Sequence, residues 1–157
     1  MKLSDHASLS FGGSVRLQGE SFINESFIEE SNHDNFWFLE RTLLHAHFKA
    51  GWFEVFAELN SSLVAGKEDI TPVDEDQLSV NQAFLKFHFN DRLYVLLGRE
   101  NLRLGSRRLV DIREGPNVRR SFDLVKMGYT SEKLETIAFF SIVVQPNPDI
   151  FDNTSLA

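Results

Sequence analysis

Long stretches of the chain alternate strictly between apolar and polar residues. The clearest runs from Ser8 to Glu20, and a period of two predicts a strand with one apolar and one solvated face. Its length exceeds the five or six residues, roughly, that are usual in globular proteins. The positions on its apolar face are Leu9, Phe11, Gly13, Val15, Leu17 and Gly19.

The same pattern predicts six further strands. They span residues 36–49, 52–61, 80–89, 93–99, 122–129 and 134–145. A helix is the alternative for residues 36–49, because several of its apolar residues also suit a period of 3.6. Its aromatic and Thr content, and the short link through Gly51, favour a hairpin instead.

Connections between the predicted strands are alternately short and long. Short turns are predicted at Gly51, Asn90-Asp91 and Ser131-Glu132, and long polar loops at 25–35, 62–77 and 101–120, with a tail after Gln145 that is predicted to be loop. An up-and-down barrel with turns at one rim and loops at the other has this order. We therefore expect an all-β fold, one antiparallel up-and-down β-barrel segment over 1–157, of about seven strands. Bacterial barrels use an even number, so we expect a partial barrel.

Composition narrows the classes of function. The formal net charge is -7, which argues against nucleic acid as the main partner, since binders usually present a basic face. Cysteine is absent, which excludes disulfides, a thiol nucleophile and Cys-ligated zinc. No apolar run approaches the roughly 18 residues of a transmembrane helix, but alternating β spans are not excluded. Residues 1–13 do not read as a secretory leader, so we expect that it was removed or that the chain stays inside.

Arginine is concentrated in one segment. Seven of the ten arginines lie between Leu96 and Asp123, a positive island in an acidic chain. Clustered guanidinium groups suit planar, bidentate recognition of carboxylate or phosphate. The alternative is an ordinary solvated loop, because a run of charges is weak evidence for a site.

No catalytic or metal-binding constellation is evident. His45 and His47 share a strand face with Arg41, and no third metal ligand is placed nearby, so a polar stripe is the better interpretation. Glu54 and Glu58 on one strand would lie about 13 Å apart, too far for a glycosidase pair. We expect no enzymatic activity, no cofactor and no metal.

Three segments resemble a known family. They are Leu97-Gly98-Arg99-Glu100, residues 105–110 and residues 117–123, the last with the sequence NVRRSFD. With the strand around Arg41, they resemble the alginate-export family of outer-membrane β-barrels, and the resemblance extends over Leu9 to Val144. It implies a larger single-chain barrel of which this chain is the N-terminal part, an incomplete domain of that type. It also implies the outer membrane of a Gram-negative bacterium.

The resemblance implies a function as well: a channel that exports an anionic polysaccharide such as alginate. Rings of arginine select anions in a pore. By this resemblance, Arg99 points into the lumen, and the residues that line or cover an anion-selective lumen are Arg41, Arg99, Arg103, Arg107, Arg108, Arg119 and Arg120. Outer-membrane lipid and periplasmic secretion-complex components are the other implied partners. The alternative is a soluble periplasmic all-β module whose arginine loop binds an acidic ligand or partner.

Overall fold

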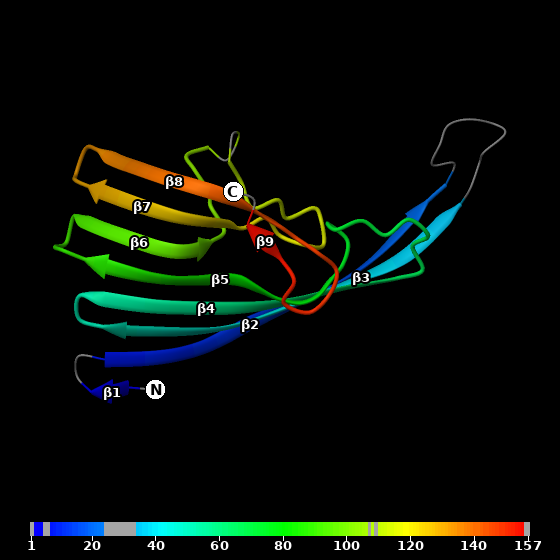
Figure 1. Ribbon diagram of the computed structural model, residues 1–157, viewed down its shortest axis with the longest axis horizontal. Coiled ribbons are helices and arrows are strands. Elements are labelled where there is room, and N and C mark those ends of the chain that lie inside the picture. The colour runs from blue at the N-terminus through cyan, green and yellow to red at the C-terminus, as the bar shows by residue number, and fades with distance from the viewer. Residues whose placement is uncertain (1, 5–6, 24–33, 107, 109, 156–157) are drawn as a thin grey trace.

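The computed structural model describes residues 2–4, 7–23, 34–106, 108 and 110–155, and these form one antiparallel sheet. Its order is that of the chain, β1 to β9, each strand pairing with the next (Figure 1). The strands are β1 (Lys2–Ser4), β2 (Ala7–Phe22), β3 (Asn35–Ala50), β4 (Phe53–Ala65), β5 (Asp76–His88), β6 (Leu93–Glu100), β7 (Phe122–Thr130), β8 (Glu135–Gln145) and β9 (Thr154–Ser155). The first and last strands in this order do not pair, so the described sheet is an open, partial barrel.

The seven predicted strands are β2 to β8, and the all-β meander is confirmed. Residues 36–49 lie in β3, so the helical alternative is wrong. The prediction that the tail contains no strand is also wrong, because Thr154 and Ser155 pair with the end of β8. The sequence missed β9 because two residues are too few to show a period.

The two rims differ as predicted. Short turns join β3 to β4, β5 to β6 and β7 to β8 at one end, and segments 66–75 and 101–121 join strands at the other (Figure 1). The predicted loop at 25–35 falls almost entirely on residues 24–33, outside the described residues. Strand β4 continues to Ala65, four residues into the loop predicted to begin at residue 62.

Strands β2 and β3 pair in unbroken register from Ala7 opposite Ala50 to Phe22 opposite Asn35. The register holds through Gly12 and Gly13, so no bulge accounts for these glycines. A Cβ at Gly12 would instead lie 2.7 Å from Nε2 of His45, on the facing strand. The glycine therefore makes room for an imidazole ring.

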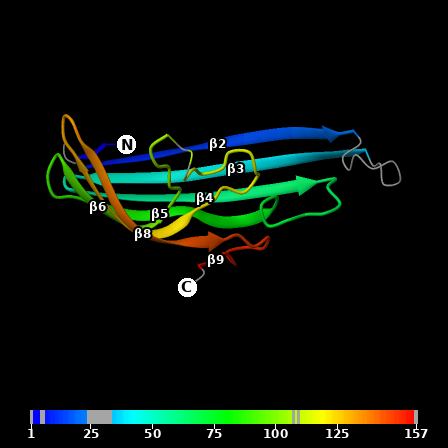
Figure 2. The same cartoon turned by 90° about the horizontal axis from the view of Figure 1, so that it is seen from above.

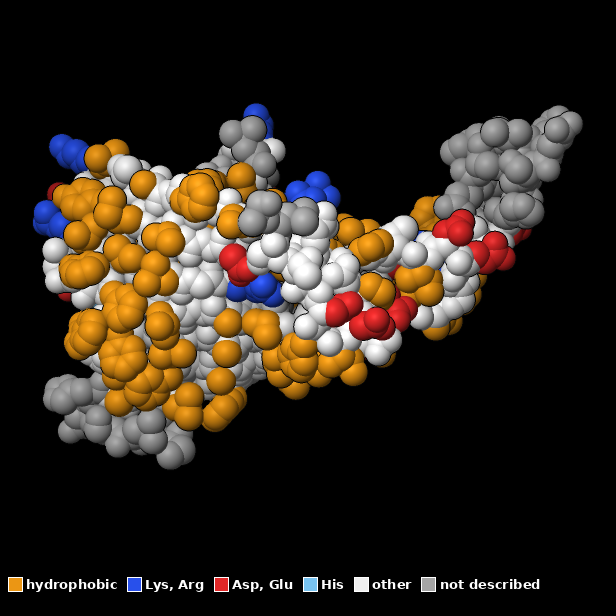
Figure 3. Space-filling view, viewed as in Figure 1, with side chains coloured by type: hydrophobic (Ala, Val, Ile, Leu, Met, Phe, Trp, Pro, Cys, Tyr) orange, Lys and Arg blue, Asp and Glu red, His pale blue; other side chains and the backbone are white. Residues whose placement is uncertain are grey.

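One face of the sheet, which we call the outer face, is apolar and exposed. Register assigns the side chains to it, because residues opposite each other across paired strands point to the same side. Figure 3 shows hydrophobic side chains gathered over the half that carries the short turns. The exposed outer-face side chains include Phe11, Val15, Leu17, Phe38, Leu44, Leu59, Leu63, Leu85, Leu97, Val125, Met127 and Phe140.

The opposite, inner face is polar along β2 and carries the small core farther along the sheet. Leu96 of β6 and Leu124 of β7 are buried there together with Leu102, which lies just beyond β6. Phe56 and Phe84 stack on the same face at a centroid distance of 5.2 Å. The core thus sits where segment 101–121 leaves the sheet, and it fixes the start of that segment.

Candidate functional site

Segment 101–121 folds back over the inner face of the sheet instead of extending from the rim (Figure 2). Leu102 is buried against Leu96 and Leu124, and Leu104 and Val110 pack beside them. The Leu104 N–H donates to the carbonyl of Val110 at 3.2 Å, which closes the first part of the segment on itself. The segment therefore lies across strands, while the side chains of Arg103, Arg108 and Arg113 stay exposed.

Asn117 anchors the far end of the segment. Its side chain is 1% exposed, and Nδ2 donates to the backbone carbonyls of Glu40 (3.0 Å), Leu63 (3.1 Å) and Asp74 (2.9 Å). Buried polar groups are stable only when hydrogen-bonded, and this amide meets that condition with carbonyls from three separate parts of the chain. It joins the segment to β3, to β4 and to segment 66–75.

Backbone groups around Asn117 strengthen the same attachment. The Ser62 hydroxyl donates to the Asn117 carbonyl at 3.1 Å. The Val118 N–H donates to the carbonyl of Val73 at 2.9 Å, so segments 66–75 and 101–121 are bonded to each other. The long-loop rim is therefore a connected layer over the inner face.

Four arginines surround Glu114. Its carboxylate accepts from Arg41 at 2.7 Å, from Arg119 at 2.8 Å and from Arg103 at 3.2 Å. Arg16 of β2 donates to the Glu114 backbone carbonyl at 2.6 Å. We call these five residues the Glu114 cluster.

The Glu114 cluster carries excess positive charge. Asp111 lies 3.5 Å from Arg103 and is the only other carboxylate that forms an ion pair with these arginines among the described residues. Four guanidinium groups and two carboxylates leave a surplus of two positive charges. Partial burial alone would raise the pKa of Glu114, but hydrogen bonds from Arg41 and Arg119, and their charges, hold that pKa below its ordinary value.

The remaining predicted site residues are placed differently. Arg99 forms a two-pronged ion pair with Asp123, at 2.7 and 3.0 Å, outside the Glu114 cluster. Arg108 is exposed, and Arg120 is half-buried beside the cluster. Arg107 lies outside the described residues. The structure thus brings Arg41, Arg103 and Arg119 together, whereas register places Arg99 and Asp123 on the outer face, with Leu97 and Val125.

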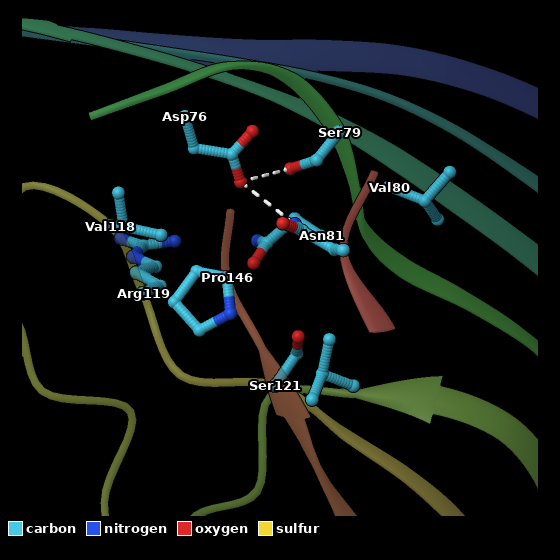
Figure 4. A pocket seen from close by; sticks show the side chains of 10 residues that line it. Asp76, Ser79, Val80, Asn81, Val118, Arg119, Ser121 and Pro146 are labelled. Carbon is cyan, nitrogen blue, oxygen red and sulfur yellow. Dashed lines mark hydrogen bonds between the residues drawn. The ribbon is translucent and has the colours of Figure 1, made fainter. Parts of the chain in front are cut away.

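A small polar cavity lies next to Arg119 (Figure 4). Asp76, at the start of β5, is buried in its wall, and Oδ2 accepts from Ser79 at 2.6 Å and from Asn153 at 2.8 Å. Oδ1 of Asp76 and Nε of Arg119 have no protein hydrogen-bond partner. The cavity volume is about 10 Å³, which is the space of about one water molecule.

Comparison with known proteins identifies the family. The family model for alginate export matches residues 7–156, nearly the whole chain. The chain belongs to the alginate export family. Neither a curated protein nor a solved structure matches it. The alginate export family is a family of outer-membrane transport proteins of Gram-negative bacteria. Among the described residues, no helix is long and apolar enough to cross a lipid bilayer.

In this member of the alginate export family, the sheet also carries a second charged network, which the sequence did not predict. Glu54 of β4 bridges His47 at 2.8 Å and His88 at 2.6 Å, with Lys49 at 3.3 Å. The sequence groups His47 with His45 on the same strand face. In the structure the partner of His47 is Glu54, from the other strand of the hairpin. No group of three or more His, Asp and Glu suited to a metal is found in the described part of the chain.

Arg16, Glu114 and Asn117 were also missed as site residues. A usable signal was present, because Arg16 and Arg41 are both rare charges in the middle of long strands, and consecutive strands pair. The contacts of Asn117 left no signal, since they depend on how the segment folds back.

Proposed function

We propose that this member of the alginate export family forms part of the wall of an outer-membrane channel that exports an anionic polysaccharide such as alginate. The observation that carries the proposal is the contrast between the two faces of one sheet. The outer face exposes apolar side chains from β2 to β8, and the inner face carries the Glu114 cluster. A wall between lipid and an anion-conducting lumen needs that division.

The arginines of segment 101–121 are the selective element in this proposal. A surplus of fixed positive charge attracts a polyanion, while several weak sites let it move from one to the next. The ion pairs with Glu114 and Asp111 hold the guanidinium groups in place and moderate their attraction. The element comprises Arg41, Arg103, Arg107, Arg108, Arg119 and Arg120, with Arg16 added from β2, and it leaves out Arg99, whose register places it on the outer face.

The two faces and two rims of the sheet indicate where lipid, polysaccharide and partner proteins would contact the protein. Outer-membrane lipid contacts the apolar outer face, and the polysaccharide passes along the inner face. The rim with short turns faces the periplasm, as in other outer-membrane barrels. Components of a secretion complex that deliver the polysaccharide would meet the protein at that rim.

A conductance measurement tests the proposal. Full-length protein is purified from outer membranes in detergent and inserted into planar lipid bilayers under a potassium chloride gradient. The proposal predicts a reversal potential of the sign given by anion selectivity, and a current that short oligouronates reduce. Cation selectivity, or a protein that stays monomeric in buffer without detergent, would favour the soluble acidic-ligand module instead.

A further inference from the structure

A groove lies beside the Glu114 cluster, between segment 66–75, segment 101–121 and the end of β8. Its volume is about 290 Å³, at the lower end of the range of about 300 to 1,000 Å³ for small-ligand pockets. Three arginines and one amide supply its polar side chains, Arg113, Arg119, Arg120 and Gln145, and of these Arg119 is already paired with Glu114. Apolar wall residues include Pro72, Val73, Pro116, Val118, Val144 and Pro146.

Arg113 and Arg120 differ from the arginines of the Glu114 cluster. Neither side chain forms an ion pair or hydrogen bond with another residue in the described part of the chain, whereas Arg41, Arg103 and Arg119 all reach a carboxylate. Burial, and then the charge of Arg113, lowers the pKa of Arg120. Two neighbouring positive charges without a counter-ion are unfavourable, and an anion bound between them would relieve the repulsion.

The backbone also holds Arg113 in an unusual conformation. Its φ is 57°, in the left-handed region, where a residue other than glycine is strained. The effect is that Arg113 lines the groove while the next residue, Glu114, joins the cluster. Such strain persists only where the surroundings enforce it, and it tends to accumulate at ligand sites.

We propose that this groove binds one carboxylate-bearing sugar unit, with Arg113 and Arg120 on the carboxylate and Gln145 on a ring hydroxyl. The identity of the ligand rests on the proposed function, because the exported chain is then a polyuronate. Proline and valine walls suit the C–H faces of a sugar ring, and guanidinium forks suit its carboxylate. Inorganic phosphate would satisfy the arginines but leave those walls without contacts.

Calorimetric titration of the detergent-solubilised full-length protein tests this site. The probes are a trisaccharide of mannuronic acid, the neutral mannose trisaccharide and inorganic phosphate. We expect the uronate to bind at least tenfold more tightly than either other probe. Each of Arg113→Gln and Arg120→Gln should weaken uronate binding about 10- to 100-fold, the effect of losing a charge-assisted hydrogen bond.

Two further variants control for loss of charge and for loss of folding. Arg92→Gln removes the same charge from an exposed position in the turn between β5 and β6, at the opposite rim, and should bind uronate as the wild type does. Arg113→Gly relieves the left-handed strain, so it should fold at least as well as the wild type and still lose uronate binding. Uronate binding by Arg113→Gly and Arg120→Gln equal to that of Arg92→Gln would overturn the site.

The bilayer experiment separates this site from the proposed function. If the wild type is anion-selective but phosphate binds as tightly as the uronate, the sugar site is wrong and the channel stands. If uronate binding depends on Arg113 and Arg120 but the pore is not anion-selective, the site is supported and the export function is wrong.

Discussion

The side-chain nitrogen of Asn117 lies 3.0 Å from the backbone carbonyl oxygen of Glu40, although 77 residues separate them in the chain. The same nitrogen also reaches the carbonyls of Leu63 and Asp74. One buried amide therefore fixes where the arginine-bearing segment meets the sheet.

Replacing that amide by a carboxylate should release the segment. Asn117→Asp turns the donor toward three carbonyl oxygens into an acceptor, and we expect a loss of about 3 kcal/mol in the free energy of holding the segment down. Trypsin cleaves after arginine, so the rate of limited trypsin cleavage within 101–121 measures the release. It should rise at least tenfold.

Ser106→Ala is the matched control, because Ser106 is an exposed residue of the same segment. It should be cleaved at the wild-type rate. Equal cleavage of Asn117→Asp and Ser106→Ala would show that Asn117 does not hold the segment.

Glu114→Gln should make the pore more anion-selective and the protein less stable. The substitution adds one net positive charge to the cluster and removes the carboxylate that pairs with Arg41, whose side chain is only 5% exposed. We expect a destabilisation of about 1 to 2 kcal/mol, less than for a fully buried pair, because Glu114 itself is half exposed. Reversal potentials measure the selectivity, and guanidinium unfolding measures the stability.

Glu132→Gln at the opposite rim removes an exposed carboxylate and is the control for charge alone. A reversal potential that shifts equally in both variants would show that the position of Glu114 has no special effect.

Attachment of the segment should weaken in acid. The pKa of Glu114 in the folded protein is lowered from its ordinary value of 4.5, so its contribution to stability is complete above pH 4.5 and is lost as pH falls through the lowered value. Cleavage of 101–121 by pepsin, corrected for its activity on an unfolded substrate, should therefore increase below pH 4.5. In Glu114→Gln that part of the pH dependence should be absent.

Substitution by arginine should destabilise the protein at one position of β2 and have little effect at the next. Val15 is 66% exposed on the outer face, and Ser14 lies on the inner face opposite Leu43. Val15→Arg should cost about 2 to 4 kcal/mol if that face meets the middle of a bilayer, and Ser14→Arg should cost little. Heat-modifiable gel mobility and unfolding in lipid vesicles compare the two. Equal stability of both variants would contradict lipid contact at the outer face.

The fold could be predicted from the sequence because successive side chains of a strand point to opposite faces of the sheet, so a difference between the faces appears as alternation along the chain. Leu17 and Gln18 already show which side is apolar, and the register then confirms that Leu17 and Phe38 share a face. Strand β9 and the end of β4 at Ala65 were beyond prediction, because short or polar strand ends look like loop.

The candidate site could be predicted only in part. The concentration of arginine pointed to segment 101–121, and Arg103 and Arg119 do meet there. That Arg16 and Arg41 join them depends on the segment folding inward, which follows from the contacts of Leu102 and Asn117 and not from any period in the sequence. The distinction between paired and unpaired arginines likewise needs three-dimensional positions.

In the sheet, each strand pairs with its neighbours in the chain, apart from a parallel bridge between Leu78 of β5 and Ile150 of the tail, so hairpins can form one after another with little loss of chain entropy. The bonds from Asn117 to β3 and β4 are different, because they connect residues 77 and 54 positions apart and require β3 and β4 to be already paired. We therefore expect the arginine-bearing segment to dock late in folding, after the strands beneath it have paired. The positive charge then reaches the inner face only after the strands have paired. A partly folded chain would expose its trypsin sites and would not yet bind a polyanion.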